Sequence, residues 1–156
     1  MNNKIFSNKQ ERMVSDFLGW KQVTGSGARP FYVGDVVSDD WLGECKTHAT
    51  IKSRIIFKCS VWNKIRIEAK SCNRFAVYFS DDGSQKAKQT YCVISSDANP
   101  FNFQCKPKNI LEATKSGNLS LSVDNLLSDI IYSSYLNGES VYIMSLSMFK
   151  SLLVDS

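Results

Sequence analysis

The stretch GDVVSDDWLGECK (34–46) carries the strongest signals for both fold and function. Aromatic and β-branched residues are enriched in strands, so FYVGDVV (31–37) predicts one strand and WLGECKTHATI (41–51) predicts the next. The polar residues SDD (38–40) are typical of the turn between two strands. Residues 31–51 are therefore predicted to form a β-hairpin.

Three side chains of this hairpin are predicted to converge: Asp35, Glu44 and Lys46. Side chains alternate between the two faces of a strand, so Glu44 and Lys46 share a face and Cys45 points the other way, toward the core. Two carboxylates suit Mg²⁺, and a lysine beside them can orient a water molecule or offset charge on a phosphoryl group. The alternative is that Asp35 ends a strand and that Glu44 and Lys46 form a surface pair.

The segment before the hairpin predicts a helix and a loop. NKQERMVSDFLGW (8–20) has the apolar spacing of an amphipathic helix, with Asn8 as the N-cap, and TGSGARP (24–30) predicts a flexible loop. Glu11 lies at the inward edge of the helix, so it either completes a capping box with Asn8 or points into a site. The apolar stripe consists of Met13, Val14, Phe17 and Leu18.

Further elements follow the hairpin. Residues 57–73 predict a second helix, and RFAVYF (74–79) and TYCVIS (90–95) predict a second hairpin. The 156 residues fit one α/β domain, with a core over about 8–96 and a C-terminal extension over about 97–156. In the extension, we expect a loop with a short helix near 109–115, a helix over 121–136, a strand over 140–146 and a helical turn or two over 147–153.

Charge is distributed unevenly along the chain. Nineteen Lys and Arg residues face fifteen Asp and Glu residues, and eight of the basic residues lie within residues 46–74, where Glu68 is the one acid. Such a basic segment is expected of a protein that binds a phosphate backbone. The alternative is a solvated helix face that is rich in lysine. On the first interpretation, Lys52, Arg54 and Lys58 line a track for DNA.

Several classes of site and of location are disfavoured by composition. With one histidine, His48, a Ser-His-Asp triad or a histidine metal site would have to use this residue, so chemistry must rest mainly on carboxylates, lysine and a hard metal. The five cysteines form no CxxC pair and are expected to be reduced thiols. No apolar run approaches the ~18 residues of a membrane span. We therefore expect a cytoplasmic protein, in the host cytoplasm if a phage encodes it.

The order of these features resembles the PD-(D/E)xK nuclease superfamily and, more narrowly, the Holliday-junction resolvases of archaeal and phage type. Those proteins have an N-terminal helix with Glu-Arg, a Gly-Ser loop, an Asp at a strand end and E-C-K on the next strand. The resemblance covers roughly residues 9–80, and Gly34 stands where the superfamily motif has proline. The matching residues are Glu11-Arg12, Gly25-Ser26-Gly27, Gly34-Asp35-Val36 and Glu44-Cys45-Lys46.

The resemblance implies a restriction-endonuclease-like mixed β-sheet flanked by helices, and an Mg²⁺-dependent endonuclease, with Mn²⁺ as a substitute metal. Asp35 and Glu44 would bind the metal, and Lys46 would assist the attacking water. Glu11 would be an accessory acid near the metal. Contacts with the DNA would come from Arg12, Ser26 and Arg29.

The implied substrate is a four-way junction or other branched DNA, in DNA recombination or repair. Symmetric cutting of two strands needs two active sites, so we expect a C2 homodimer. Two alternatives stay open. One is another nuclease of the same superfamily, acting in repair, defence or restriction, and the other is a non-catalytic DNA-binding module of the same fold.

Overall fold

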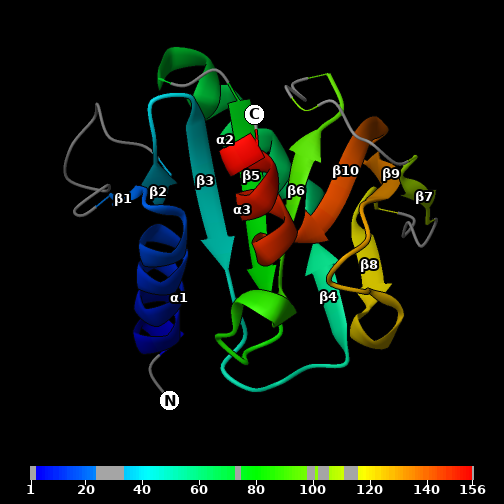
Figure 1. Cartoon of the computed structure of the whole chain (residues 1–156), viewed down its shortest axis with the longest axis horizontal. Helices are drawn as coiled ribbons and strands as arrows, with labels where there is room; N and C mark the ends of the chain where they lie inside the picture. Colours follow the sequence, from blue (N-terminus) through cyan, green and yellow to red (C-terminus); the bar gives the residue numbers. More distant parts are fainter. Residues whose placement is uncertain are drawn as a thin grey trace.

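The structure is a computed structural model that describes residues 3–23, 34–72, 75–97, 101, 106–110 and 116–155. The described residues form a mixed α/β fold (Figure 1). The helices are α1 (Asn3–Leu18), α2 (Cys59–Cys72) and α3 (Leu146–Asp155), with 3₁₀ turns η1 (Ala87–Gln89) and η2 (Val123–Asn125). In spatial order, the large sheet contains β1 (Lys21–Gln22), β2 (Val36–Val37), β3 (Trp41–Lys46), β5 (Phe75–Asp81), β6 (Thr90–Ser95), β10 (Glu139–Ser145), β9 (Tyr132–Leu136) and β7 (Lys108–Asn109). The smaller sheet pairs β4 (Arg54–Phe57) with β8 (Leu119–Ser122).

Most of the described strand pairs are antiparallel, but β3 and β5 run parallel, from Trp41↔Phe75 to Lys46↔Ser80. Parallel neighbours need a crossover connection, which here contains β4 and α2. The hairpin of β2 and β3 and the crossover to β5 therefore form one continuous unit. The last residue of β3 is Lys46, so the second strand of the predicted hairpin ends five residues before Ile51.

Helices cover both faces of the large sheet. Trp62 and Ile65 of α2 pack with Leu42 in one core, to which β4 and β8 also contribute. Val14 of α1 and Phe149 of α3 belong to the core on the opposite face. Figure 1 shows α3 in front of the sheet and α2 behind it. The predicted arrangement of a mixed sheet between helices is thus confirmed at this coarse level.

The two predicted N-terminal helices are present, with different boundaries at the first one. The stripe of Trp62, Ile65 and Ala69 is buried as predicted. The first helix extends back to Asn3, so Asn8 lies inside α1 and the prediction that it caps the helix is wrong. Glu11 consequently lies at mid-helix, where a capping-box role is not possible.

The C-terminal part differs most from prediction. The helix predicted over 121–136 is wrong, because this segment holds the end of β8, the turn η2 and β9. The short helix predicted near 109–115 begins on Asn109, which belongs to β7, and residues 111–115 lie outside the described residues. The second hairpin, the strand over 140–146 and the final helix are confirmed as β5–β6, β10 and α3 within one or two residues.

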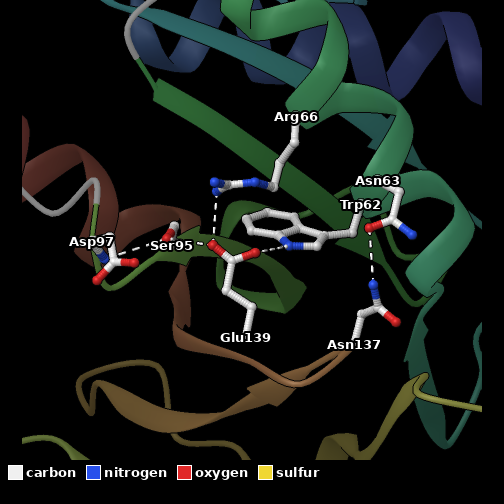
Figure 2. Close-up of polar contacts among 7 residues, drawn as sticks. All are labelled: Trp62, Asn63, Arg66, Ser95, Asp97, Asn137 and Glu139. Atoms are coloured by element: carbon white, nitrogen blue, oxygen red, sulfur yellow. Dashed lines mark hydrogen bonds and ion pairs between the residues drawn. The ribbon is translucent and has the colours of Figure 1, made fainter.

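The carboxylate of Glu139 ties β10 to α2 and β6 (Figure 2). One oxygen accepts a 2.8 Å hydrogen bond from Nε1 of the fully buried Trp62. The other oxygen accepts a 2.7 Å hydrogen bond from Ser95 Oγ and pairs with Arg66 at 2.8 Å. The C-terminal part is therefore joined to the rest of the fold by polar contacts with α2 as well as by the pairing of β10 with β6. Among the described helices, none is both long and apolar enough to span a membrane.

Candidate active site

Asp35 lies immediately before β2, and its place against β3 depends on neighbouring glycines. Its N–H donates a 2.9 Å hydrogen bond to the carbonyl of Gly43 on β3. The preceding Gly34 has a φ of +75°, and a Cβ there would lie 2.6 Å from Leu42 Cδ1. A Cβ on Gly43 would lie 2.6 Å from the ring of Phe79. Both glycines are therefore needed for the close approach that brings Asp35 against β3, and Gly43 lies within a strand rather than in a turn.

The Asp35 carboxylate is held against the strand that carries Glu44 and Lys46. Its Oδ2 atom accepts a 2.8 Å hydrogen bond from the backbone N–H of Cys45. Cys45 itself is 7% exposed and packs on the α1 side of the sheet, as alternation predicted. The two residues that flank Cys45 consequently lie on the opposite face, next to the anchored carboxylate.

Glu44 and Lys46 form an ion pair in which the two partners differ in exposure. Glu44 Oε1 lies 3.5 Å from Lys46 Nζ, and the exposed fractions of the two side chains are 7% and 49%. The alternative of a surface pair is therefore wrong for Glu44, which is buried. A buried carboxylate beside a half-exposed ammonium is an arrangement in which Lys46 can reach a molecule bound from outside.

Helix α1 contributes two neighbouring polar side chains to the same place. Gln10 is fully buried, and its Nε2 atom donates a 2.7 Å hydrogen bond to the backbone carbonyl of Lys46. Glu11 accepts a 3.2 Å hydrogen bond from Gln22 Nε2, and burial, followed by the negative charge of the nearby Asp35, raises the pKa of Glu11. The four residues proposed from sequence, Glu11, Asp35, Glu44 and Lys46, are thus brought together from α1, the residue before β2 and β3.

The clustering of carboxylates changes their protonation. Burial, followed by the negative charge of Asp35, raises the pKa of Glu44 to about 7, against the opposing effects of Lys46 and Lys64. Burial and the charge of Asp35 likewise raise the pKa of Glu11. These carboxylates repel one another in a partly dry environment, which is the electrostatic condition that favours binding of a cation.

The donor set fits a hard divalent cation. Within the described ranges, no three or more His, Cys, Asp and Glu side chains form a group that could hold a metal ion. Mg²⁺ does not need such a group, because proteins commonly bind it through one or two carboxylates while it keeps several waters. Asp35 and Glu44 supply two carboxylates beside one backbone N–H, so they are the residues that would hold Mg²⁺.

The remaining predicted site residues are more dispersed. Ser26 and Arg29 lie outside the described residues. Arg12 is exposed on α1, next to Glu11. Lys52, Arg54 and Lys58 are all exposed, but they follow β4 and its flanks rather than a helix face.

Sequence patterns alone missed four side chains around the site. Gln10 and Gln22 contact Lys46 and Glu11, while Lys64 and Glu68 on α2 influence the pKa of Glu44. The spacing of Lys64 and Glu68, four residues apart, is typical of an ion pair on a helix, and their side chains lie 3.9 Å apart. Nothing in the local sequence marks Gln10, since its role depends on how α1 packs against the end of β3.

No protein-family model, no curated protein and no solved structure matches the chain. Support for a function therefore comes from the geometry and electrostatics of the site and from the features of the sequence.

Proposed function

We propose that the chain is an Mg²⁺-dependent endonuclease of restriction-endonuclease-like fold, which hydrolyses phosphodiesters in branched DNA and prefers four-way junctions. One observation carries the proposal: Asp35 is hydrogen-bonded to the strand segment that presents Glu44 and Lys46, with Glu11 beside them. The topology is compatible, since a hairpin is followed by a crossover helix and a parallel strand. The resemblance of the sequence to resolvases supports the choice of substrate.

Each residue has a distinct role in this proposal. Asp35 is fixed by the Cys45 N–H and Glu44 is held by burial and by its ion pair with Lys46, and the charge of Asp35 acts on Glu44. Bound Mg²⁺ would lower the pKa of a coordinated water and offset the charge of the scissile phosphate. Lys46 would orient the attacking water or stabilise charge that develops on the phosphate. Glu11 would bind a water molecule or make an additional contact with the cation at the edge of the site.

The charge of the chain and its resemblance to resolvases support the proposed substrate class. A segment with eight basic residues and one acid suits a phosphate backbone, which is read without regard to base sequence. Contacts to the backbone carry no base sequence, so the proposal takes the shape of the DNA as the recognition cue. Cleavage at two symmetric positions would require a C2 homodimer.

A cleavage assay tests this function directly. Purified protein is incubated with a labelled four-way junction, or with a linear duplex built from the same arms, in Mg²⁺ or in EDTA. We expect symmetric nicks in the junction that require Mg²⁺. Equal cleavage of both substrates would replace the resolvase assignment with a general nuclease of the same superfamily. Tight binding without cleavage in either condition would favour a non-catalytic DNA-binding module.

A further inference from the structure

The pair of strands β4 and β8, here called the ribbon, presents one apolar face and one polar face. The apolar face consists of Ile55, Phe57, Leu119 and Leu121, which are all fully buried in the core beneath α2. Because side chains alternate along a strand, the outward positions of β4 are Arg54 and Ile56, and those of β8 are Ser120 and Ser122. Figure 1 shows the ribbon beside the end of the large sheet that carries β9 and β7.

The outward face of the ribbon is basic. Lys52, Arg54 and Lys58 lie at every second or fourth position along β4 and its two flanks, and all three are exposed. Ser120 and Ser122 add two hydroxyl groups from β8. Acidic side chains occur at none of these described outward positions, and Asp124 in η2 is the acid that follows next along the chain.

Arg54 is fixed across the ribbon by β8. Its Nε atom donates a 2.9 Å hydrogen bond to Ser120 Oγ, and its Nη2 atom donates a 3.1 Å hydrogen bond to the Ser120 carbonyl. A guanidinium that is already oriented loses less side-chain entropy when it binds a phosphate. The strand that supplies Ser120 belongs to the C-terminal part of the chain, which contains no residue of the candidate active site.

The ribbon lies within reach of the active site along the chain. Lys46 ends the catalytic strand β3, and Lys52 follows six residues later, before β4. Six residues span at most about 21 Å when fully extended. That distance corresponds to roughly six base pairs of duplex DNA, at about 3.4 Å per base pair. One arm of a bound DNA could therefore contact both places.

We propose that the outward face of the ribbon is a docking surface for the phosphate backbone of a duplex DNA arm, and that β8 orients Arg54 for this contact. The proposal rests on the proposed nuclease function for the identity of the ligand. It assigns a role to the C-terminal extension, since β8 is the partner strand that completes the surface. The occupant is duplex DNA because the face offers three cations and two hydroxyl groups and requires no particular base.

A charge-matched pair of triple variants tests the surface. Lys52→Gln, Arg54→Gln and Lys58→Gln are combined in one protein, and Lys4→Gln, Lys88→Gln and Lys150→Gln are combined in the control. The control residues lie on α1, η1 and α3, which pack on the opposite face of the large sheet. Binding of a fluorescein-labelled linear duplex is measured by anisotropy in EDTA over a range of salt concentrations, and circular dichroism checks folding.

We expect the ribbon variant to bind at least about tenfold more weakly at low salt, with the slope of log K against log salt reduced by about 2–3, since each lost phosphate contact reduces it by about 0.9. The control variant should show a clearly smaller loss of affinity and a clearly smaller reduction of the slope. Equal losses in the two variants, or an unchanged slope in the ribbon variant, would overturn the proposal.

Ser120→Ala tests the part played by β8, because it removes the hydroxyl that accepts a hydrogen bond from Arg54 and leaves every charge in place. We expect binding to weaken about two- to fivefold, in line with loss of one hydrogen bond. Unchanged binding would overturn the orienting role of the Ser120 hydroxyl on β8.

Cleavage by the wild-type protein separates this proposal from the proposed function. If the wild-type protein cleaves and the ribbon variant binds duplex normally, the ribbon proposal fails while the nuclease function stands. If the wild-type protein binds without cleaving and the ribbon variant loses binding, the ribbon proposal holds and the nuclease function fails. Absence of duplex binding by the wild-type protein would overturn the ribbon proposal, and cleavage of the four-way junction would still decide the nuclease function.

Discussion

The carboxylate of Asp35 accepts a 2.8 Å hydrogen bond from the backbone N–H of Cys45, between the two residues that form the Glu44–Lys46 ion pair. This contact fixes an acid from outside the strand against the centre of the E-C-K segment. It depends on Gly34 and Gly43, which allow the two backbones to approach closely. The relationship explains why burial and repulsion raise the pKa of Glu44, and several consequences can be measured.

Glu44→Gln should stabilise the metal-free protein at alkaline pH. Because the pKa of Glu44 is raised from 4.5 to about 7, the folded state binds this proton more tightly than the unfolded state, and wild-type stability falls as pH rises through that window. The variant does not titrate, so its free energy of unfolding should exceed that of the wild type by up to about 3 kcal/mol above pH 8. The difference should vanish near pH 4.

Urea unfolding at several pH values measures this difference. Asp39→Asn is the matched control, because Asp39 is an exposed acid in the turn between β2 and β3 and its substitution should change stability by no more than about 0.5 kcal/mol. If the Glu44→Gln variant is no more stable than the wild type at pH 8.5, burial does not raise the pKa of Glu44.

Binding of Mg²⁺ should depend on pH in the same window. A metal ligand must be deprotonated, and the pKa of Glu44 is about 7 before metal binds. The apparent affinity should rise about tenfold per pH unit below pH 6.5 and level off above about pH 8, as expected for release of one proton. Calorimetric titration of the protein with Mg²⁺ measures it. An affinity that is constant over this range would remove Glu44 from the metal site.

Gln10→Met should slow cleavage more than it weakens DNA binding. Gln10 is fully buried and its amide holds the backbone carbonyl of Lys46, so it is a positioning residue that acts through Lys46. Methionine keeps the volume and removes the donor, and the free energy of unfolding should fall by about 1–3 kcal/mol. The single-turnover cleavage rate at saturating DNA should fall roughly tenfold, equivalent to about 1.4 kcal/mol. A rate that equals that of the wild type would make the contact purely structural.

Glu139→Ala should destabilise the fold more than Glu139→Gln. The alanine variant leaves Nε1 of the buried Trp62 without its acceptor, which costs about 1–3 kcal/mol. Glutamine keeps one acceptor oxygen, and the lost ion pair with Arg66 is partly exposed and contributes little. Denaturant midpoints of both variants and of Asn63→Ala, which removes an exposed contact to Asn137, measure the order. Equal midpoints for the two Glu139 variants would show that the acceptor of Trp62 is dispensable.

The centre of the site was predictable because it depends on local patterns. Alternation along one strand is enough to place Glu44 and Lys46 on one face and Cys45 on the other, and the structure agrees. The contribution of Gln10 was not predictable, since it requires knowing that α1 packs against the last residue of β3. Tertiary contacts of this kind leave no periodic signal in the sequence.

The error over 121–136 had a signal against it. Leu126 and Ile130 have helical spacing, but LSLS (119–122) alternates as a strand does. The dipeptide Asn137-Gly138 is a strong signal for a two-residue hairpin turn, and both residues have positive φ, at 54° and 76°. Leu136 and Glu139 pair across this turn. Turn chemistry would have predicted the hairpin of β9 and β10 and removed the helix.

Single-turnover cleavage of a four-way junction in Mg²⁺ by Asp35→Asn and by Asp39→Asn tests the proposed active site most directly. Both variants remove one acid near β2, but the carboxylate of Asp35 accepts a hydrogen bond from the strand of Glu44 and Lys46, whereas Asp39 is exposed in the turn. We expect the cleavage rate of Asp35→Asn to fall at least about 10²-fold, which is typical of removing one group that stabilises the transition state, and the rate of Asp39→Asn to stay within about twofold of wild type. If Asp35→Asn keeps its fold and cleaves the junction at the wild-type rate, this result would contradict the proposed active site.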